Sequence, residues 1–419
     1  MKYRAPKCFH CTNFFFSVLF IAGLLMVIQS TQAQAQAQEV EGKVLFYNIA
    51  NSDFDPYSRD PSSAEQAWMR EHYYRQQTYK GYFNSRLAWY PLAWVYKDSY
   101  AIKPSWDIYR DHPEWVLRDA GGNQLYIPWG CSGGTCPQFA GDFGNPAFRA
   151  NWISEARSLL EDVGYAGLWV DDVNLTWRVG NGNGDIIRPV DPRTGQEMTR
   201  DNWQRYFAEF MEEIRAAFPD KEIAHNAIWY ADVTANPYIQ RQIDAADWYN
   251  LERGATDRGL KGGTGKYGFE TFLSFIDFIQ NRGHNVILMD YGDTLTKREY
   301  GLAAWFLINR GQDMISSNQL RWTAPDSWWK GYELDLGRAL GPRQTWQGLL
   351  RRDFECGIVL LNQPEMPTRS ASLDSELSDL SGNTRSTIIL AESEAAILTR
   401  ACAATNDPAP KPPINLNVN

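Results

Sequence analysis

The sequence has few histidines and lacks the usual patterns for binding metals or nucleotides. Histidine accounts for 5 of the 419 residues, and none of them stands in an H-E-x-x-H or similar zinc pattern. The first predicted strand runs into YNIANSDFD, where a Rossmann-type sheet would have a glycine-rich turn. We therefore expect neither a metal nor an organic cofactor, and a zinc hydrolase or metal-dependent deacetylase is disfavoured.

Positive charge is also scarce. The chain has 41 Lys and Arg against 50 Asp and Glu; without the basic N-terminal segment described next it keeps 38 against 50, a net charge of −12. A surface of this sign repels phosphate backbones and anionic lipid headgroups. We therefore expect no nucleic-acid partner, and no membrane partner once the N-terminus is processed.

The N-terminal apolar run is too short to span a bilayer. Residues 14–28 are apolar apart from one Ser and one Gly, about 15 residues where a membrane helix needs roughly 20. Three basic residues precede this run, and A-x-A cleavage sites ending at Ala35 and Ala37 follow it. These features predict a secretory signal peptide over residues 1–37, so that the mature protein is secreted or periplasmic. A membrane anchor is the alternative.

Cysteine is infrequent, with six in the chain, two of them in the predicted signal peptide. The other four lack the paired C-x-x-C spacing of zinc sites and suit disulfides formed in an oxidising compartment. We favour a bond between Cys131 and Cys136, which would close the flexible stretch SGGT, and a second between Cys356 and Cys402. Four cysteines allow three connectivities, so the other two stay open.

Short apolar runs alternate with helical patterns over residues 43–340. Strands are predicted in KVLFYNIAN, RLAWYPLAW, NQLYIP or QFAGDF, YAGLWV, EIAHNAIW, ADWYNLE, NVILMDYG and DMISSNQ. Helices are predicted between most of them, the first over residues 64–79. This alternation indicates parallel strands, and eight of them at this length favour a (β/α)8 TIM barrel over residues 40–342. An open doubly wound sheet is the competing architecture.

The helical period disappears beyond about residue 343. DFECGIVLLNQP, SASLDSEL and STIILAESEAAILTR are strand-like runs separated by Gly, Ser and Asn. They predict a small C-terminal antiparallel β domain over residues 343–402. Residues 403–419 are rich in Pro and Asn, and we expect a disordered tail there.

Acidic residues stand at the predicted ends of two barrel strands. Asp171 and Asp172 end the fourth strand in GLWVDDV, and Glu252 follows the sixth in WYNLERG. Catalytic residues of such barrels lie at the C-terminal ends of the strands. Hydrolysis of a glycosidic bond needs one carboxylic acid and one carboxylate. We therefore predict a glycoside hydrolase acting on a polysaccharide, with Asp171 and Glu252 as the catalytic pair.

The roles within this pair stay open. Trp248 and Tyr249 precede Glu252 closely in the sequence, and apolar surroundings would raise the pKa of its carboxyl. This favours Glu252 as the general acid and Asp171 as the nucleophile or base, although the reverse assignment also fits.

Other polar and aromatic residues near the same strand ends are predicted to bind sugar through hydroxyl hydrogen bonds and ring stacking. Salt bridges, helix caps and core packing are the alternative roles for these side chains. The predicted binding residues are Tyr47, Trp89, Asp172, His225, Asn226, Trp229, Asn250 and Asp290.

Three short motifs invite other interpretations. GCSGG at residues 130–134 matches G-x-S-x-G, yet TCPQF follows it where a nucleophile elbow requires a helix. GGTGKYG departs from the phosphate-loop pattern at two positions. NGNGD at residues 181–185 could bind calcium but is more typical of a turn.

Three segments resemble a known family. HPEWVLRDAGGNQLYI, GDFGNPAFRANWISEA and GYAGLWVDDV are similar to motifs of predicted bacterial glycoside-hydrolase-like TIM barrels related to the endo-α-1,4-polygalactosaminidase group. The resemblance implies that Asp171 and Glu252 are the functional acids, although Ala166 stands where the family often has Asp. It also implies a β domain after the barrel. A non-catalytic secreted carbohydrate-binding barrel is the rival hypothesis, and we expect a monomer in either case.

Overall fold

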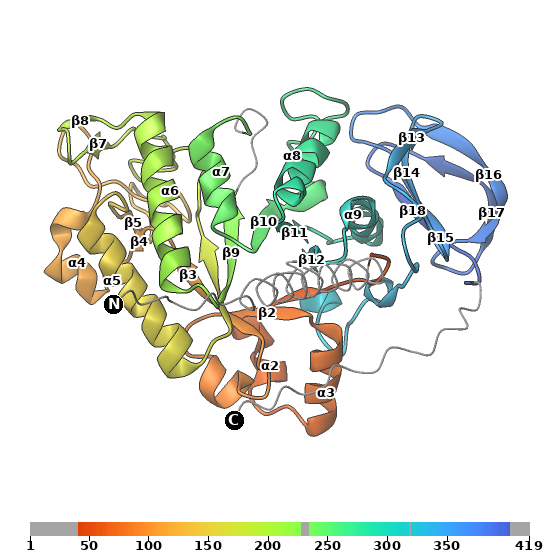
Figure 1. Ribbon diagram of the computed structural model, residues 1–419, viewed down its shortest axis with the longest axis horizontal. Helices are drawn as coiled ribbons and strands as arrows, with labels where there is room; N and C mark the ends of the chain where they lie inside the picture. The colour runs from red at the N-terminus through yellow and green to blue at the C-terminus, as the bar shows by residue number, and fades with distance from the viewer. Residues whose placement is uncertain (1–40, 228–233, 318–319, 403–419) are drawn as a thin grey trace, which may run out of the picture.

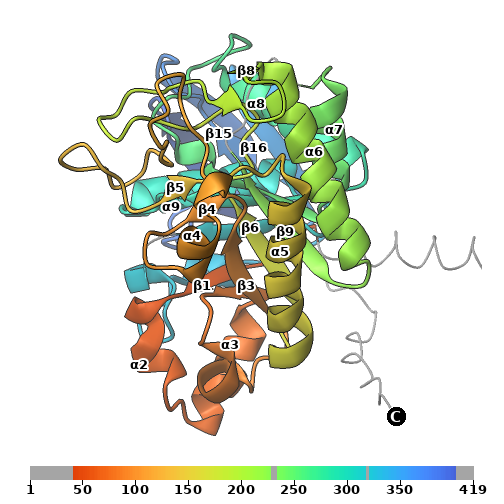
Figure 2. The same ribbon diagram turned by 90° about the vertical axis from the view of Figure 1, so that its left-hand side faces the viewer.

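The computed structural model describes residues 41–227, 234–317 and 320–402. The predicted signal peptide, the predicted tail and Trp229 lie outside these residues. Eight parallel strands form the central sheet (Figures 1 and 2). In spatial order they are β1 (Tyr47–Ala50), β2 (Arg75–Thr78), β3 (Ala93–Asp98), β6 (Gly167–Asp171), β9 (Glu222–Ala227), β10 (Trp248–Arg253), β11 (Asn285–Asp290) and β12 (Met314–Ser317).

The sheet closes on itself. Phe46, directly before β1, forms a parallel bridge with Ile315 of β12, and the amide of Ile315 donates to the carbonyl of Leu45 at 3.0 Å. The first and last strands are therefore neighbours, which confirms the predicted (β/α)8 barrel.

Helices surround the barrel, and polar caps fix where most of them begin. Ser62 and Glu65 form a reciprocal capping box, and Asn145 and Asn236 each cap a helix that starts with proline. The helices are α2 (Asp55–Ser58), α3 (Ser63–His72), α4 (Asp107–Asp111), α5 (Pro146–Arg157), α6 (Arg200–Ala217), α7 (Pro237–Asp244), α8 (Phe269–Asn281) and α9 (Leu295–Ile308). Shorter helical turns are η1 (Ser52–Phe54), η2 (Phe83–Leu87), η3 (Pro113–Trp115), η4 (Ser158–Val163), η5 (Gly254–Thr256), η6 (Leu320–Trp322) and η7 (Lys330–Glu333).

Aromatic side chains fill the interior of the barrel. Trp94, Trp169 and Trp248 project inward from three strands and pack with Tyr47 and neighbouring aliphatic residues. Glu222 accepts a hydrogen bond from the Trp94 indole at 2.7 Å and pairs with the guanidinium of Arg75. This closely packed core supports the C-terminal ends of the strands.

The second and third barrel strands differ from the prediction. The segment RLAWYPLAW was expected to be the second strand, whereas residues 83–87 are helical and β2 is the earlier segment RQQT. RQQT has no apolar residue although all four of its residues are buried, and Gln77 accepts a hydrogen bond from the hydroxyl of Tyr47, so a hydrophobic pattern cannot reveal this strand. The third strand is Ala93–Asp98, and NQLYIP and QFAGDF lie in the connection that follows.

Two long connections cover one side of the barrel mouth. Residues 99–145 contain β4 (Ala101–Ile102), β5 (Phe139–Ala140) and α4, and residues 172–199 contain β7 (Val190–Asp191) and β8 (Gln196–Glu197). Tyr126 and Gly180 join them through two backbone hydrogen bonds of 2.9 and 2.8 Å. Arg193 adds an ion pair with Asp142, so the two connections form one wall.

An antiparallel sheet follows the barrel, as predicted. Its strands are β13 (Gln344–Trp346), β14 (Leu349–Phe354), β15 (Gly357–Leu361), β16 (Arg369–Ser378), β17 (Thr384–Leu390) and β18 (Ala395–Thr399), in the order β13-β14-β15-β18-β16-β17. Figure 1 shows α9 between this sheet and the barrel strands. Arg352 of β14 donates to the carbonyls of Phe306 and Asn309, which ties the sheet to the end of α9.

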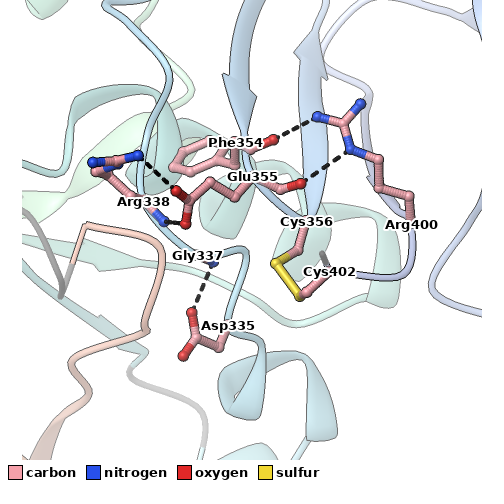
Figure 3. The surroundings of a disulfide bond; sticks show 8 residues. All are labelled: Asp335, Gly337, Arg338, Phe354, Glu355, Cys356, Arg400 and Cys402. Carbon is pink, nitrogen blue, oxygen red and sulfur yellow. Dashed lines mark hydrogen bonds and ion pairs between the residues drawn. A yellow bond between two sulfur atoms is a disulfide. The ribbon is translucent and has the colours of Figure 1, made fainter. Parts of the chain in front are cut away.

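The structure contains both disulfides favoured from the sequence, Cys131–Cys136 and Cys356–Cys402. Figure 3 shows the second bond, which links the turn after β14 to the segment beyond β18. Arg400 supports it by donating to the carbonyls of Phe354 and Glu355. Within the residues that the structure describes, no helix is both long and apolar enough to cross a membrane.

Candidate active site

A cavity of about 1210 Å³ opens where strands β3, β6, β9 and β10 end. Its lining includes Asp171, Asp172, Asn226 and Glu252, and it extends from there along α5 and the connection of residues 99–145. Small-molecule sites usually occupy about 300–1,000 Å³. The cavity therefore has room for a ligand larger than one sugar ring.

Asp171 and Glu252 meet in this cavity through one amide. Asn226 Nδ2 donates to Asp171 Oδ1 at 2.8 Å and to Glu252 Oε2 at 3.2 Å. The two carboxylate oxygens are therefore at most 6.0 Å apart, the sum of these distances. Strand β9 lies between β6 and β10 in the sheet, so it carries the bridging amide between the two acids.

Asp171 is held by three hydrogen bonds that favour its charged form. Besides Asn226, Tyr96 donates its hydroxyl to Asp171 Oδ2 at 2.7 Å, and the amide of Asp172 donates to Oδ1 at 2.8 Å. Burial raises the pKa of the Asp171 carboxyl, and the hydrogen bonds from Asn226, Tyr96 and the Asp172 amide oppose that rise. The result is a half-buried acid with a fixed orientation.

Asp172 points away from Asp171 because the backbone turns sharply between them. Its φ of 54° is left-handed, a region that Asp tolerates better than most residues. Asp172 Oδ1 accepts from Arg178 at 3.1 Å and from Asn174 at 3.2 Å. Burial, followed by the nearby charge of Asp171, raises the pKa of Asp172 to about 7. Asp171 therefore shares a hydrogen-bond donor with Glu252, whereas Asp172 forms an ion pair with Arg178.

Glu252 is held more loosely than Asp171. Among the residues that the structure describes, its hydrogen bonds are one of 3.2 Å from Asn226 and one of 3.4 Å from the hydroxyl of Tyr291. Trp248 and Tyr249, the aromatic residues expected to surround Glu252, pack elsewhere. Trp248 packs against Trp94 in the barrel core, four residues before Glu252, and Tyr249 faces the helix side beside Phe275.

Two predicted binding residues lie beneath the cavity. Tyr47 is fully buried and donates its hydroxyl to Gln77 at 2.6 Å, and Gln77 lines the cavity. Asn250 is also fully buried and donates to Asn226 Oδ1 at 2.6 Å, which turns the Asn226 amide nitrogen toward the two acids. Both residues thus orient lining side chains from below.

Three other predicted binding residues lie away from the cavity lining. His225 is fully buried on the outer face of β9, where desolvation lowers its pKa to about 3. Asp290 lies under η5 and accepts from the amide and hydroxyl of Thr256 at 3.2 Å. Trp89 sits in the turn after η2 and donates its indole N–H to the carbonyl of Arg86. Side chains on the outward pleat of a strand or in a preceding turn cannot reach the mouth.

Several cavity residues were not predicted from the sequence. Tyr96 and Asp98 come from β3, which was assigned to the wrong segment, and Arg178 comes from a long connection. Placing the strand over AWVYKD would have put Asp98 at a strand end beside Asp171, its partner in the parallel register. Burial, with the charges of Asp172 and Asp171, raises the pKa of Asp98 well above its usual range.

The family model for hypothetical glycosyl hydrolase family 15 matches residues 81–358, about two thirds of the chain. The chain belongs to this family. The match confirms the predicted glycoside-hydrolase-like family and identifies the chain as a glycoside hydrolase. The matched region contains Asp171, Asn226 and Glu252. No curated protein shows significant sequence similarity to the chain.

The solved structures to which the chain is similar are remote in sequence. The glycoside hydrolase domain of PelA from Pseudomonas aeruginosa has 14% identity and a TM-score of 0.39, covering 66% of this chain and 94% of that one. The noncanonic maltogenic α-amylase AmyB from Thermotoga neapolitana has 12% identity and a TM-score of 0.48, covering 87% and 100%. An Anoxybacillus α-amylase has 11% and 0.45, covering 88% and 99%. The functional assignment follows from the family match.

Proposed function

We propose that this glycoside hydrolase cleaves a polysaccharide by a retaining two-carboxylate mechanism, with Asp171 as nucleophile and Glu252 as acid and base. The observation that carries the proposal is the shared hydrogen-bond donor, because it brings both carboxylates to one point of a large cavity. Paired acids at this point of a barrel are the minimum machinery for breaking a glycosidic bond.

The separation of the two acids supports retention. Carboxyl groups stand about 5–5.5 Å apart in retaining enzymes and about 6.5–9.5 Å apart in inverting ones, which must fit a water between them. The two oxygens on Asn226 are no more than 6.0 Å apart. This limit lies below the inverting range.

The hydrogen bonds support the division of roles. Asp171 accepts three hydrogen bonds that stabilise its carboxylate, as an attacking nucleophile requires. Within the described residues Glu252 has two longer hydrogen bonds, so it can exchange a proton without breaking a tight network. In the first step Asp171 attacks the anomeric carbon while Glu252 protonates the departing oxygen. In the second step Glu252 takes a proton from water, and that water displaces Asp171.

The location and organisation of the protein belong to the same proposal. Two disulfides suit an oxidising compartment, and the predicted signal peptide of residues 1–37 would direct the chain there. We propose that the mature protein is a secreted or periplasmic monomer with a barrel over residues 40–342, a β domain over residues 343–402 and a tail over residues 403–419. We propose that the reaction needs no metal and no organic cofactor, because the two carboxylates supply the chemistry.

A polysaccharide screen tests this function. The mature protein is incubated with neutral, acidic and amino-sugar polysaccharides, and new reducing ends are measured against a D171N/E252Q double variant. Release of reducing ends by the wild type alone supports the proposal. Tight binding to a polysaccharide with no turnover across the pH range would contradict it and favour a carbohydrate-binding barrel.

A further inference from the structure

The cavity continues beyond the acids to aromatic rings that are open to solvent. Trp129 is 62% exposed and Trp106 is 42% exposed, and both line the same cavity as Asp171 and Glu252. They are the only tryptophans among the large hydrophobic side chains found exposed in the described part of the chain. Isolated exposed hydrophobic residues are common, but two indoles on one functional cavity need a reason.

The backbone holds Trp129 firmly. The amide of Trp129 donates to the carbonyl of Ile127 at 2.8 Å, and the disulfide between Cys131 and Cys136 closes the loop that follows. Within that loop Ser132 and Thr135 form a β-bridge. The stretch GCSGG, which resembles a nucleophile elbow in sequence, is thus part of a short disulfide-closed turn next to the exposed ring of Trp129.

The second long connection supports this loop from behind. Gly182 has a φ of 85°, and a Cβ there would lie 2.2 Å from the carbonyl oxygen of Gly134. Only glycine permits this approach. The NGNGD stretch therefore packs against the disulfide loop. Trp129 lies outside the barrel strands, but the loop next to it is held by the disulfide and by this contact.

Trp106 stands at the start of α4, in the same connection as Trp129. Its amide donates to the carbonyl of Lys103, and the Lys103 ammonium lies 5.5 Å from the ring centre, which orients the indole. Figures 1 and 2 show α4, β4 and β5 beside α5, the helix along which the cavity extends. The two rings thus belong to the outer wall, on a different part of the chain from the strand ends that carry the acids.

We infer that Trp106 and Trp129 form a distal sugar-binding subsite, which stacks on pyranose rings of a chain whose scissile bond lies at Asp171 and Glu252. Flat indole faces suit the C–H face of a pyranose and lose little entropy on binding because their support is already fixed. The inference rests on the proposed function and deepens it. A ligand that occupies both regions would contact the acids with one part of the sugar chain and the indole rings with another.

The test compares W129A, W106A and the conservative W129F with the wild type on the polysaccharide that the screen identifies. We expect kcat/KM on the polymer to fall about tenfold in each alanine variant, mainly through KM, and to recover in part in W129F. Cleavage of a short aryl glycoside of the same sugar should stay within twofold of the wild type. Tyr267→Ala is the matched control, since Tyr267 is 48% exposed and lies outside the cavity lining.

The outcomes separate this inference from the proposed function. Equal kinetics of W129A, W106A and the wild type on the polymer would overturn the subsite and leave the hydrolase intact. If the wild type cleaves no polysaccharide, the subsite is tested by affinity electrophoresis in gels that contain soluble starch, polygalacturonate or chitosan. Retardation of the wild type that W129A loses would uphold the subsite without hydrolysis. Equal retardation of both, or none of the wild type, would overturn it.

Discussion

Asp171 and Glu252, which are 81 positions apart in the sequence, hydrogen-bond to the same amide nitrogen of Asn226. The barrel makes this possible because the three residues stand at the ends of adjacent strands in the order β6, β9 and β10. Asn250 fixes the amide from below, and Tyr96 fixes Asp171 from the side. The pair is therefore organised before any substrate arrives, which lowers the cost of reaching the transition state.

Removing each acid separately should give different chemistry with azide. Asp171→Ala and Glu252→Ala should each lower kcat by about 10²–10⁴-fold on an activated aryl glycoside. Azide should restore turnover in both and give glycosyl azides of opposite anomeric configuration, retained for Glu252→Ala and inverted for Asp171→Ala. The products are assigned by NMR. Glu161→Ala, which removes an exposed ion pair with Arg157, is the control. The reverse pattern of configurations would exchange the two roles.

Tyr96→Phe should move the acidic limb of the pH–rate profile. The Tyr96 hydroxyl donates to Asp171 and lowers the pKa of that carboxyl, so its loss raises the pKa and shifts the limb to higher pH. Activity at the optimum should also fall about tenfold, as expected for losing a hydrogen bond to a charged group. Tyr57→Phe removes a comparable hydroxyl bond to Asp326 outside the cavity and should leave the profile unchanged. An unshifted acidic limb in Tyr96→Phe would contradict this role.

Asp290 should make the protein less stable as the pH rises from about 4 to about 7. Burial raises its pKa from 3.8 to about 7 in the folded state, so over this range the folded protein keeps a proton that the unfolded chain releases. Each unit of that shift corresponds to about 1.4 kcal/mol. Asp290→Asn should flatten the pH dependence of the unfolding free energy and stabilise the protein above pH 7. Urea unfolding at several pH values measures this.

The control for that experiment is Asp220→Asn at an exposed position. A slope between pH 4 and 7 that is identical in wild type and Asp290→Asn would show that Asp290 does not titrate as described. Loss of stability in Asp290→Asn at every pH would instead indicate that Thr256 requires a carboxylate partner.

The two disulfides should contribute unequally to stability. Cys356–Cys402 joins residues 46 positions apart and Cys131–Cys136 joins residues 5 apart. Loop-closure entropy then predicts losses of about 4 and about 2 kcal/mol in unfolding free energy for the corresponding double serine variants. Urea unfolding of both variants gives the comparison, and the reverse order would contradict it. The Cys131/Cys136 variant should in addition weaken turnover of the polymer more than that of a short substrate.

Six of the eight barrel strands were predictable because their apolar runs carry the pattern of a strand buried on both faces. The run GLWVD shows this clearly and leads directly to Asp171. β2 could not be found in this way, since RQQT is polar although all four of its residues are buried. Misplacing β2 and β3 hid Tyr96 and Asp98, two neighbours of the acid pair.

The acid pair itself could be chosen from strand ends, whereas the supporting residues depended on pleat direction. Asn226 and Asn250 point into the barrel and join one network, while their neighbour His225 points to the helices. A shift of one residue along a strand reverses this direction. Trp129 gave no local signal, because the sequence does not show that the loop beside it packs against residues about fifty positions further along the chain.

Reducing-end release by D171N and by E252Q, each compared with the wild type on the same polysaccharide, tests the central claim most directly. The geometry predicts that either neutral substitution lowers the rate at least 10²-fold while circular dichroism shows an unchanged fold. Wild-type activity in either single variant would show that the two acids at Asn226 are not the pair that breaks the bond.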